Sequence, residues 1–194
     1  MAKIGLTDLR YAVVDSETEQ VTTVTRIRGA QSAKLDVSNE NEKIYADDGV
    51  YAVIGSGISD AKLELGLADL KQEDRTKILG IKVVDGIEEY HKDTDPPYVC
   101  VTWKEKHHNK GYIYYALLKG KFAIPSSEGK TKEDKVSAQT DSIEGQFMPR
   151  QKDELVFLIG DDQHADFTVE KFYKKAYGIT VTDPTQDTTV ALDK

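Results

Sequence analysis

The residue types best suited to metal binding or hydrolysis gather in the run DDQHAD, which holds Asp161, Asp162, His164 and Asp166. Carboxylate oxygens and an imidazole this close together could bind a divalent cation and support a metal-dependent hydrolase. The run lacks the twelve-residue calcium-loop pattern and any helical H-x-x-x-H pair. A polar loop ahead of a helix, capped by Asp166, explains the run about as well, and we assign no metal ligand here.

Three other candidates for chemistry have structural explanations. The adjacent His107 and His108 lie in a polar run between two predicted strands, where they should point apart at a solvated hairpin tip without a third ligand. The GSG at residues 55–57 lacks the third glycine of a dinucleotide fingerprint and the lysine of a phosphate loop, which favours a turn. Cys100 lies inside a strand pattern, where a thiol packs more often than it reacts. The sequence therefore predicts no enzyme, no catalytic residue and no cofactor.

The chain is acidic: its 194 residues include 34 Asp and Glu against 26 Lys and Arg, a formal net charge of −8. Such a balance offers no electrostatic footprint for gripping DNA or an anionic membrane, although the protein could still enclose DNA. Cys100 is the only cysteine, so no disulfide is possible within one chain. The N-terminus has no apolar run long enough for a signal peptide or a membrane helix, which predicts a soluble protein that is at first cytoplasmic.

Three strands separated by polar connections are predicted in the central block, residues 95–150. Residues 98–104 alternate between two faces with a period of two, as in a pleated strand. Residues 112–122 are apolar on both faces, with Tyr112 and Tyr114 on one of them, so this strand must be covered twice. A neighbouring subunit could supply the second cover.

The third strand of the block, at residues 136–148, changes parity near residues 141–142, which suggests a β-bulge. Outside the block, further strands are predicted at residues 12–14, 21–27, 33–37, 61–67 and 155–159. Many short strands with turn signals are typical of an antiparallel β-sandwich or barrel.

Two helices are predicted on the flank of this β domain. The first covers residues 68–79, with Asp69 as its N-cap and Gly80 closing its C-terminus. The second covers residues 168–177 and is ended by Gly178. We therefore expect a mainly β chain, one domain over residues 1–194 with a flanking α-helix and extended arms.

Two segments could serve as those arms. In residues 38–57 a turn signal at Asp48-Gly49 separates two β-rich runs, so this segment is either a long projecting arm or an ordinary hairpin on the domain's own sheet. The arm would carry the apolar residues Tyr45, Tyr51, Val53 and Ile54. Residues 179–194 are rich in Thr and Asp and are either a flexible tail or an arm that orders against a neighbour.

Several stretches in series resemble one family. They are ADDG at residues 46–49, LELGLADL at 63–70, ILG at 78–80, DPPYV at 95–99, YYALLKGKF at 114–122 and QTDSIEGQF at 139–147. In order and spacing they resemble the major tail proteins, or tail-tube subunits, of long-tailed, non-contractile bacteriophages.

The resemblance implies a structural virion protein, with no catalysis, whose hexameric rings stack into a tube for DNA ejection. It also implies that a long loop near ADDG and terminal arms join the rings. The implied partners are other copies of the chain, the tape measure, terminator and distal tail proteins, and double-stranded DNA that passes without specific binding. No membrane is implied, and the protein would lie in the virion tail tube after assembly in the host cytoplasm.

Combined with the strand patterns, the resemblance predicts an assembly interface made of Tyr45, Asp47, Asp48, Tyr51, Val53, Ile54, Tyr112 and Tyr114. A different class of function stays open beside it. A monomeric β-sandwich could bind carbohydrate or a receptor through exposed Tyr and Trp side chains.

Overall fold

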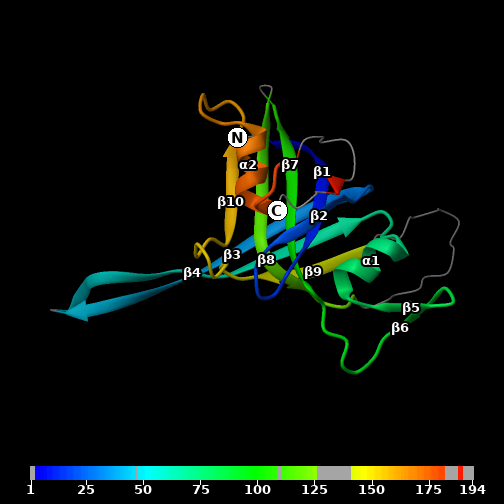
Figure 1. Cartoon of the computed structure of the whole chain (residues 1–194). Helices are drawn as coiled ribbons and strands as arrows, with labels where there is room; N and C mark the ends of the chain where they lie inside the picture. The colour runs from blue at the N-terminus through cyan, green and yellow to red at the C-terminus, as the bar shows by residue number, and fades with distance from the viewer. Residues whose placement is uncertain (1–2, 47, 109–110, 126–140, 182–187, 190–194) are drawn as a thin grey trace, which may run out of the picture.

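A computed structural model of the chain describes residues 3–46, 48–108, 111–125, 141–181 and 188–189. These residues form a mainly β fold with two helices (Figure 1). The strands are β1 (Lys3–Val14), β2 (Val21–Arg26), β3 (Ala30–Ala46), β4 (Gly49–Leu67), β5 (Lys82–Val84), β6 (Ile87–Glu89), β7 (Tyr98–His107), β8 (Tyr112–Phe122), β9 (Asp141–Phe147), β10 (Phe157–Asp161) and β11 (Thr188–Thr189). The helices are α1 (Gln72–Leu79) and α2 (Val169–Tyr177).

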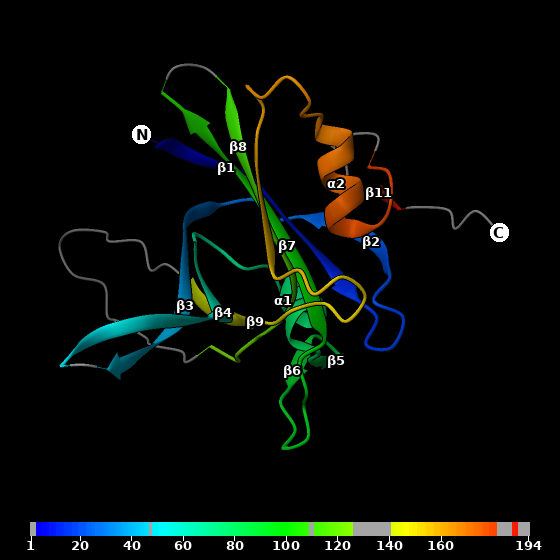
Figure 2. The ribbon, with the colours of Figure 1, turned by 90° about the vertical axis from the view of Figure 1, so that its left-hand side faces the viewer.

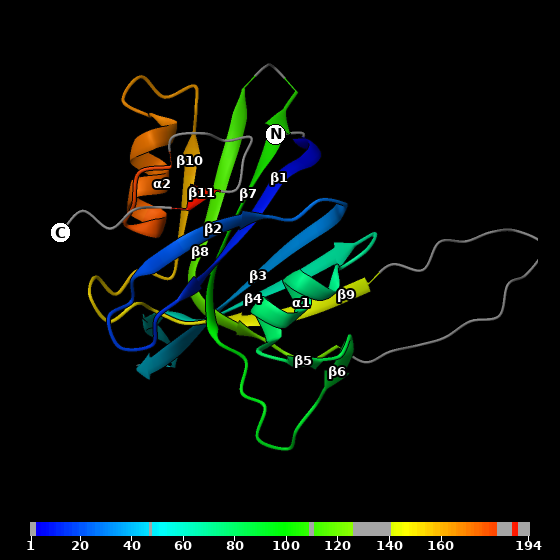
Figure 3. The same ribbon diagram turned by 45° about the vertical axis from the view of Figure 1, so that its right-hand side comes forward.

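One antiparallel sheet runs in the order β11-β2-β1-β7-β8-β9-β4-β3, and β5 and β6 form a separate hairpin. Strand β8 is the branch point, because its residues 113–117 pair with β10 and its residues 120–122 pair with β9. The sheet bends there, so that β4 and β9 cross the direction of β7 and β8 (Figure 3). Among the described strands no barrel closes, and the two halves face one another like the sheets of a sandwich.

Two apolar cores lie on the two faces of β1, β7 and β8, which gives three layers (Figure 2). The first core fills the bend and joins residues of β4 and β7, such as Leu65 and Val101, with Leu79 of α1. The second joins Cys100 of β7 to Tyr177 and its neighbours on α2. The central strands are therefore apolar on both faces, as the sequence of β8 predicts.

Helix α1 is shorter than predicted, and Asp69 is not its N-cap. The helix begins at Gln72 after Lys71, whose side chain makes no capping hydrogen bond. The backbone before it is held elsewhere: Ala68 N donates to Gly29 O at 2.8 Å, and Leu70 N donates to Asp141 Oδ2 at 3.2 Å. These bonds hold the backbone of residues 68–70 outside the helix. The predicted end is confirmed, since Gly80 has a left-handed φ of 67°.

Several strand predictions need correction. Strand β1 begins at Lys3, well before residue 12, and β9 pairs with β4 without a register shift from Asp141 to Phe147. The described part of this strand therefore has no bulge at residues 141–142, and residues 136–140 lie outside the described ranges. Residues 55–57 are not a turn. They lie inside β4, where Gly57 adopts a φ of 78° at a register shift against β3.

The C-terminal segment is described only in part. Residues 179–181 follow α2, and Thr188 pairs with Val24 of β2. The other residues of the predicted arm at 179–194 lie outside the described ranges.

Candidate assembly surfaces

The outer half of the β3–β4 hairpin, residues 39–60, projects from the body of the molecule (Figures 1 and 2). Strand β9 pairs with β4 only from Ala61 to Leu67, so β4 residues before Ala61 have β3 as their partner strand. The base of the hairpin thus belongs to the domain's own sheet, and its outer half overlaps the segment 38–57 for which an arm or an ordinary hairpin was predicted. We call residues 39–60 the arm.

The tip of the arm carries an unusual amount of exposed apolar surface. Tyr45 is 68% exposed, Tyr51 is 76% exposed and Val53 is 56% exposed. Tyr51 has no cross-strand partner in the register, because Ile44 pairs with Ala52 and Tyr45 pairs with Val50. Large side chains that stay in water at the end of a projecting hairpin are typical of a contact surface.

The polar turn of the arm is only partly described. Asp48 is exposed with a left-handed φ of 59°, and Gly49 already pairs with Ala46. The chain therefore reverses its direction before Gly49, one residue earlier than the predicted Asp48-Gly49 turn. Asp47, and the side chain of Ile54, lie outside what the structure describes.

The second face of β8 is covered by the chain itself. Tyr114 is 6% exposed, and its ring packs against Phe167 and Phe172 with centroid distances of 5.3 and 5.6 Å. Tyr112 is half-buried beside the same core. A neighbouring subunit is not needed to cover this face, because α2 and the loop before it lie on it. The assembly role predicted for Tyr114 loses its physical basis.

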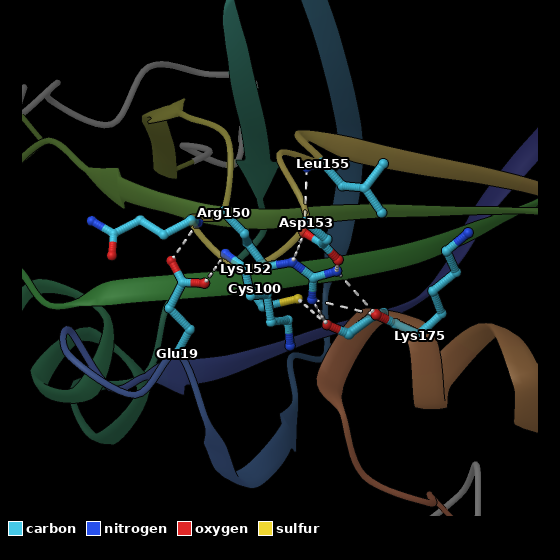
Figure 4. Close-up of polar contacts among 9 residues, drawn as sticks. Glu19, Cys100, Arg150, Lys152, Asp153, Leu155 and Lys175 are labelled. Atoms are coloured by element: carbon cyan, nitrogen blue, oxygen red, sulfur yellow. Dashed lines mark hydrogen bonds and ion pairs between the residues drawn. The ribbon is translucent and has the colours of Figure 1, made fainter.

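Arg150 ties the C-terminus of α2 to the sheet (Figure 4). Its guanidinium donates to the carbonyl oxygens of Lys175 and Ala176 at 3.3 and 3.1 Å and pairs with Asp153 at 2.6 Å. These carbonyls belong to the last turn of the helix, where partners within the helix are missing. Arg150 is therefore one of the residues that hold α2 over β8, together with the second apolar core and Tyr177, whose hydroxyl lies 2.6 Å from Thr102 Oγ1.

A buried ion pair lies beside this network. Lys119 Nζ donates to Glu19 Oε1 at 2.7 Å, with each side chain 4% exposed, and Gln151 N donates to the same carboxylate at 2.9 Å. Burial raises the pKa of Glu19, but hydrogen bonds from Lys119, Gln151 and Lys152 outweigh it and lower the pKa to about 2. We did not predict this pair, although a lysine inside the apolar run of β8 is the signal that could have indicated it.

The outer face of β3, β4 and β9 is a polar surface of alternating charges. Lys34 is paired with Asp36 at 2.7 Å, and Lys62 is paired with Glu144 at 2.6 Å. Glu64 of β4 lies opposite Lys34 of the neighbouring strand β3 and opposite Glu144 of the other neighbour, β9. Hydrogen bonds to Asp36 and Glu144 raise the pKa values of Lys34 and Lys62. Lys34 and Lys62 are thus each neutralised by a carboxylate.

The residues of DDQHAD form a turn rather than a ligand set. Asp161 Oδ1 accepts from Gln163 N at 3.0 Å, and His164 Nδ1 accepts from Asp166 N at 3.3 Å. The N-cap of α2 is Thr168, not Asp166, because the Thr168 side chain accepts from Lys171 N. Within the described ranges no group of three His, Cys, Asp or Glu side chains could hold a metal ion.

The two histidines do not point apart at a solvated tip. Their rings lie 4.9 Å apart, and His107 is buried in β7 while His108 is exposed. Cys100 packs as predicted, since it is buried with Sγ 3.8 Å from Ala176 O. Burial raises the pKa of the Cys100 thiol to about 12, so the thiol stays protonated at neutral pH.

The tryptophan cannot contribute to an aromatic binding face for carbohydrate. Trp103, the only tryptophan, is 2% exposed and stacks on Tyr115 at 5.0 Å inside the first core. A buried indole cannot stack on a sugar ring. No helix within the described residues is long and apolar enough to cross a membrane.

The model of the family described as phage tail tube protein matches residues 1–184. No curated protein matches the sequence.

Proposed function

This chain belongs to the phage tail tube protein family, and we propose that its copies form hexameric rings that stack into a hollow tube through which the phage genome is ejected. Family membership supports a structural role in the phage tail tube of the virion. We propose, in addition, that the rings are hexameric, that they stack, and that DNA passes through the tube.

The observation that carries the proposal is the arm. Its exposed tyrosines and valines find no cover within the described chain, and a hairpin of this kind can add both apolar area and backbone pairing to a second molecule. We propose that the arm, with Tyr45, Asp47, Asp48, Tyr51, Val53 and Ile54, joins one ring to the next. Tyr112 is half-buried, so only the exposed part of its side chain could contribute to a contact between subunits.

Contacts within a ring have a separate candidate. Among the described strands β3 pairs only with β4, so its outer edge has no partner strand. Long unpaired edges are sites where another chain adds a strand. We propose that this edge supports the contact between neighbouring subunits of one ring.

We propose that the polar outer face of β3, β4 and β9 lines the channel. Three carboxylates, of Asp36, Glu64 and Glu144, stand there beside two lysines that are both paired. A face without a free lysine repels phosphate and lets DNA slide without specific binding. The tape measure protein would lie in the same channel, and terminator and distal tail proteins would meet the ends of the tube. Assembly would take place in the host cytoplasm, without a membrane.

Electron microscopy of the purified protein in negative stain tests the proposal. We expect rings or tubes from the intact chain. Deletion of residues 43–54 should leave a folded subunit that no longer polymerises, because the rest of the sheet and both cores are untouched. Normal tubes from the deletion variant would show that the arm does not join the rings. A strict monomer of the intact chain at high concentration would contradict the tube itself.

A further inference from the structure

A small apolar groove lies between α1 and the β5–β6 hairpin. Its volume is about 340 Å³, at the lower end for protein binding pockets. It is lined by Gln72, Glu73, Thr76, Lys77 and Val83. Val83 is 38% exposed, and the side chain of Gln72 braces the hairpin by donating to Gly86 O at 3.2 Å. An apolar side chain on the groove floor with polar groups on its rim suits an amphipathic ring such as tyrosine.

The groove and the arm lie on opposite sides of the body (Figures 1 and 3). The arm of a chain therefore does not reach the groove of the same chain. Each copy offers one arm tip and one groove, which are different surfaces. A contact between them is heterologous, and such a contact closes into a ring or continues as an open filament, depending on the rotation between copies. A stack of rings requires the second kind, a contact that continues from one ring to the next.

One charged residue of each surface can pair with one of the other. Lys77 stands on the rim of the groove, and Asp48 stands at the tip of the arm. Neither has an ion-pair partner within the described part of the chain. Glu73, also on the rim, offers a carboxylate to which a tyrosine hydroxyl could donate.

We propose that the groove between α1 and Val83 is the receptor for the arm tip of a second copy, with a tyrosine ring on Val83 and Asp48 beside Lys77. The inference rests on the proposed stacking of rings and names the surface that receives the arm. The occupant is a second copy because the apolar tip and the apolar groove are both exposed in one chain, and because Asp48 at the tip can pair with Lys77 of the groove.

A pair of adjacent valines provides a matched test. Val83 pairs with Glu88 and Val84 pairs with Ile87, so the two valine side chains point to opposite faces of the hairpin. Both are exposed, at 38% and 49%. We expect Val83→Asp to lower the amount of sedimenting tubes at least tenfold, because it places a carboxylate on the groove floor, and Val84→Asp to assemble like the intact chain. Equal assembly of the two variants would overturn the assignment.

Cross-linking gives a second measurement that does not depend on the effect of a charge. The variant Tyr51→Cys/Val83→Cys should form a ladder of covalent multimers when assembled protein is oxidised. The variant Tyr51→Cys/Val84→Cys is the control and should not. Cys100 does not interfere, since it is buried and its thiol stays protonated. A ladder in neither variant, or an equal ladder in both, contradicts the groove.

The intact chain separates this inference from the proposed function. If the intact chain forms no rings or tubes, the proposed function fails. If it forms tubes and Val83→Asp forms them equally well, the tube stands and only the groove is wrong. Circular dichroism should give the same melting temperature for both valine variants, because both side chains are on the surface.

Discussion

Lys119 and Glu19 are 100 residues apart in the chain and form an ion pair of 2.7 Å in which each side chain is 4% exposed. The carboxylate also accepts from Gln151 N at 2.9 Å and Lys152 N at 3.3 Å. The turn after β1, the middle of β8 and the start of the loop to β10 are thereby joined at one point.

Removing one partner of this pair should be costly. We expect Lys119→Met to lower the free energy of unfolding by about 3–5 kcal/mol, because it leaves a buried carboxylate without its cation. The measurement is urea unfolding at pH 7. The double variant Lys119→Met/Glu19→Gln should recover part of the loss, since it removes the buried charge. A loss below about 1 kcal/mol for Lys119→Met would contradict the role of the pair.

The same pair predicts how stability depends on pH. The pKa of Glu19 is about 2 in the folded chain and 4.5 as its ordinary value. A lowered folded pKa contributes stability that is complete above pH 4.5 and is lost as the pH falls from 4.5 towards 2. We expect the urea midpoint of the intact chain to fall more steeply over this window than that of Glu19→Gln. Parallel curves for the two proteins would show that Glu19 does not titrate in this way.

Arg150 should decide whether α2 stays on the sheet. We expect Arg150→Met to destabilise the fold by about 1.5–3 kcal/mol, because hydrogen bonds from a charged donor to the carbonyls of Lys175 and Ala176 are lost. Hydrogen exchange should show the loss of protection first in α2. Arg28→Met is the control, since Arg28 is exposed. Similar exchange of α2 in both variants would mean that the apolar core alone holds the helix.

Gly120 marks the branch of β8 and should not accept a side chain. A Cβ atom there would clash with Gln146 O and with the ring of Phe147. We expect Gly120→Ala to destabilise the fold by about 1–3 kcal/mol, as over-packed sites do. Gly49→Ala is the matched control, because nothing lies within 4 Å of its Cβ position. Thermal melting of both variants checks the prediction, and equal melting temperatures would contradict the tight approach of β8 to β9.

Charge reversal on the outer face of β4 and β9 tests the proposed channel lining. Tubes of Glu64→Lys/Glu144→Lys should retain double-stranded DNA at low salt and release it as the salt concentration rises, because added lysines displace counterions from the phosphates. Tubes of the intact chain should not retain DNA. The variant Glu17→Lys/Asp166→Lys makes the same change in net charge at two exposed positions elsewhere. Equal retention of DNA by tubes of both variants would show that this face has no special role in the channel.

The local patterns of the chain determined most of its elements. Alternation in residues 98–104 and 61–67 predicted strands β7 and β4, and the glycines at 80 and 178 predicted where both helices end. The hairpin with Tyr45 and Tyr51 was predicted from the same kind of pattern, either as a projecting arm or as an ordinary hairpin on the domain's own sheet. These features depend on backbone preference and on the period of apolar residues, which neighbouring residues settle by themselves.

The tertiary structure alone decided which surfaces stay uncovered. The sequence shows that β8 has a second apolar face, but only the packing of α2 shows that Tyr114 on this face is covered within the chain. Only the structure shows that the apolar side chains of the arm stay exposed. Asp69 does not cap α1, since the N–H groups on either side of it, of Ala68 and Leu70, donate to Gly29 and Asp141. Glu19 pairs with Lys119, which is 100 residues away in the chain. Such contacts join residues far apart in the chain, and no local pattern of residue types contains them.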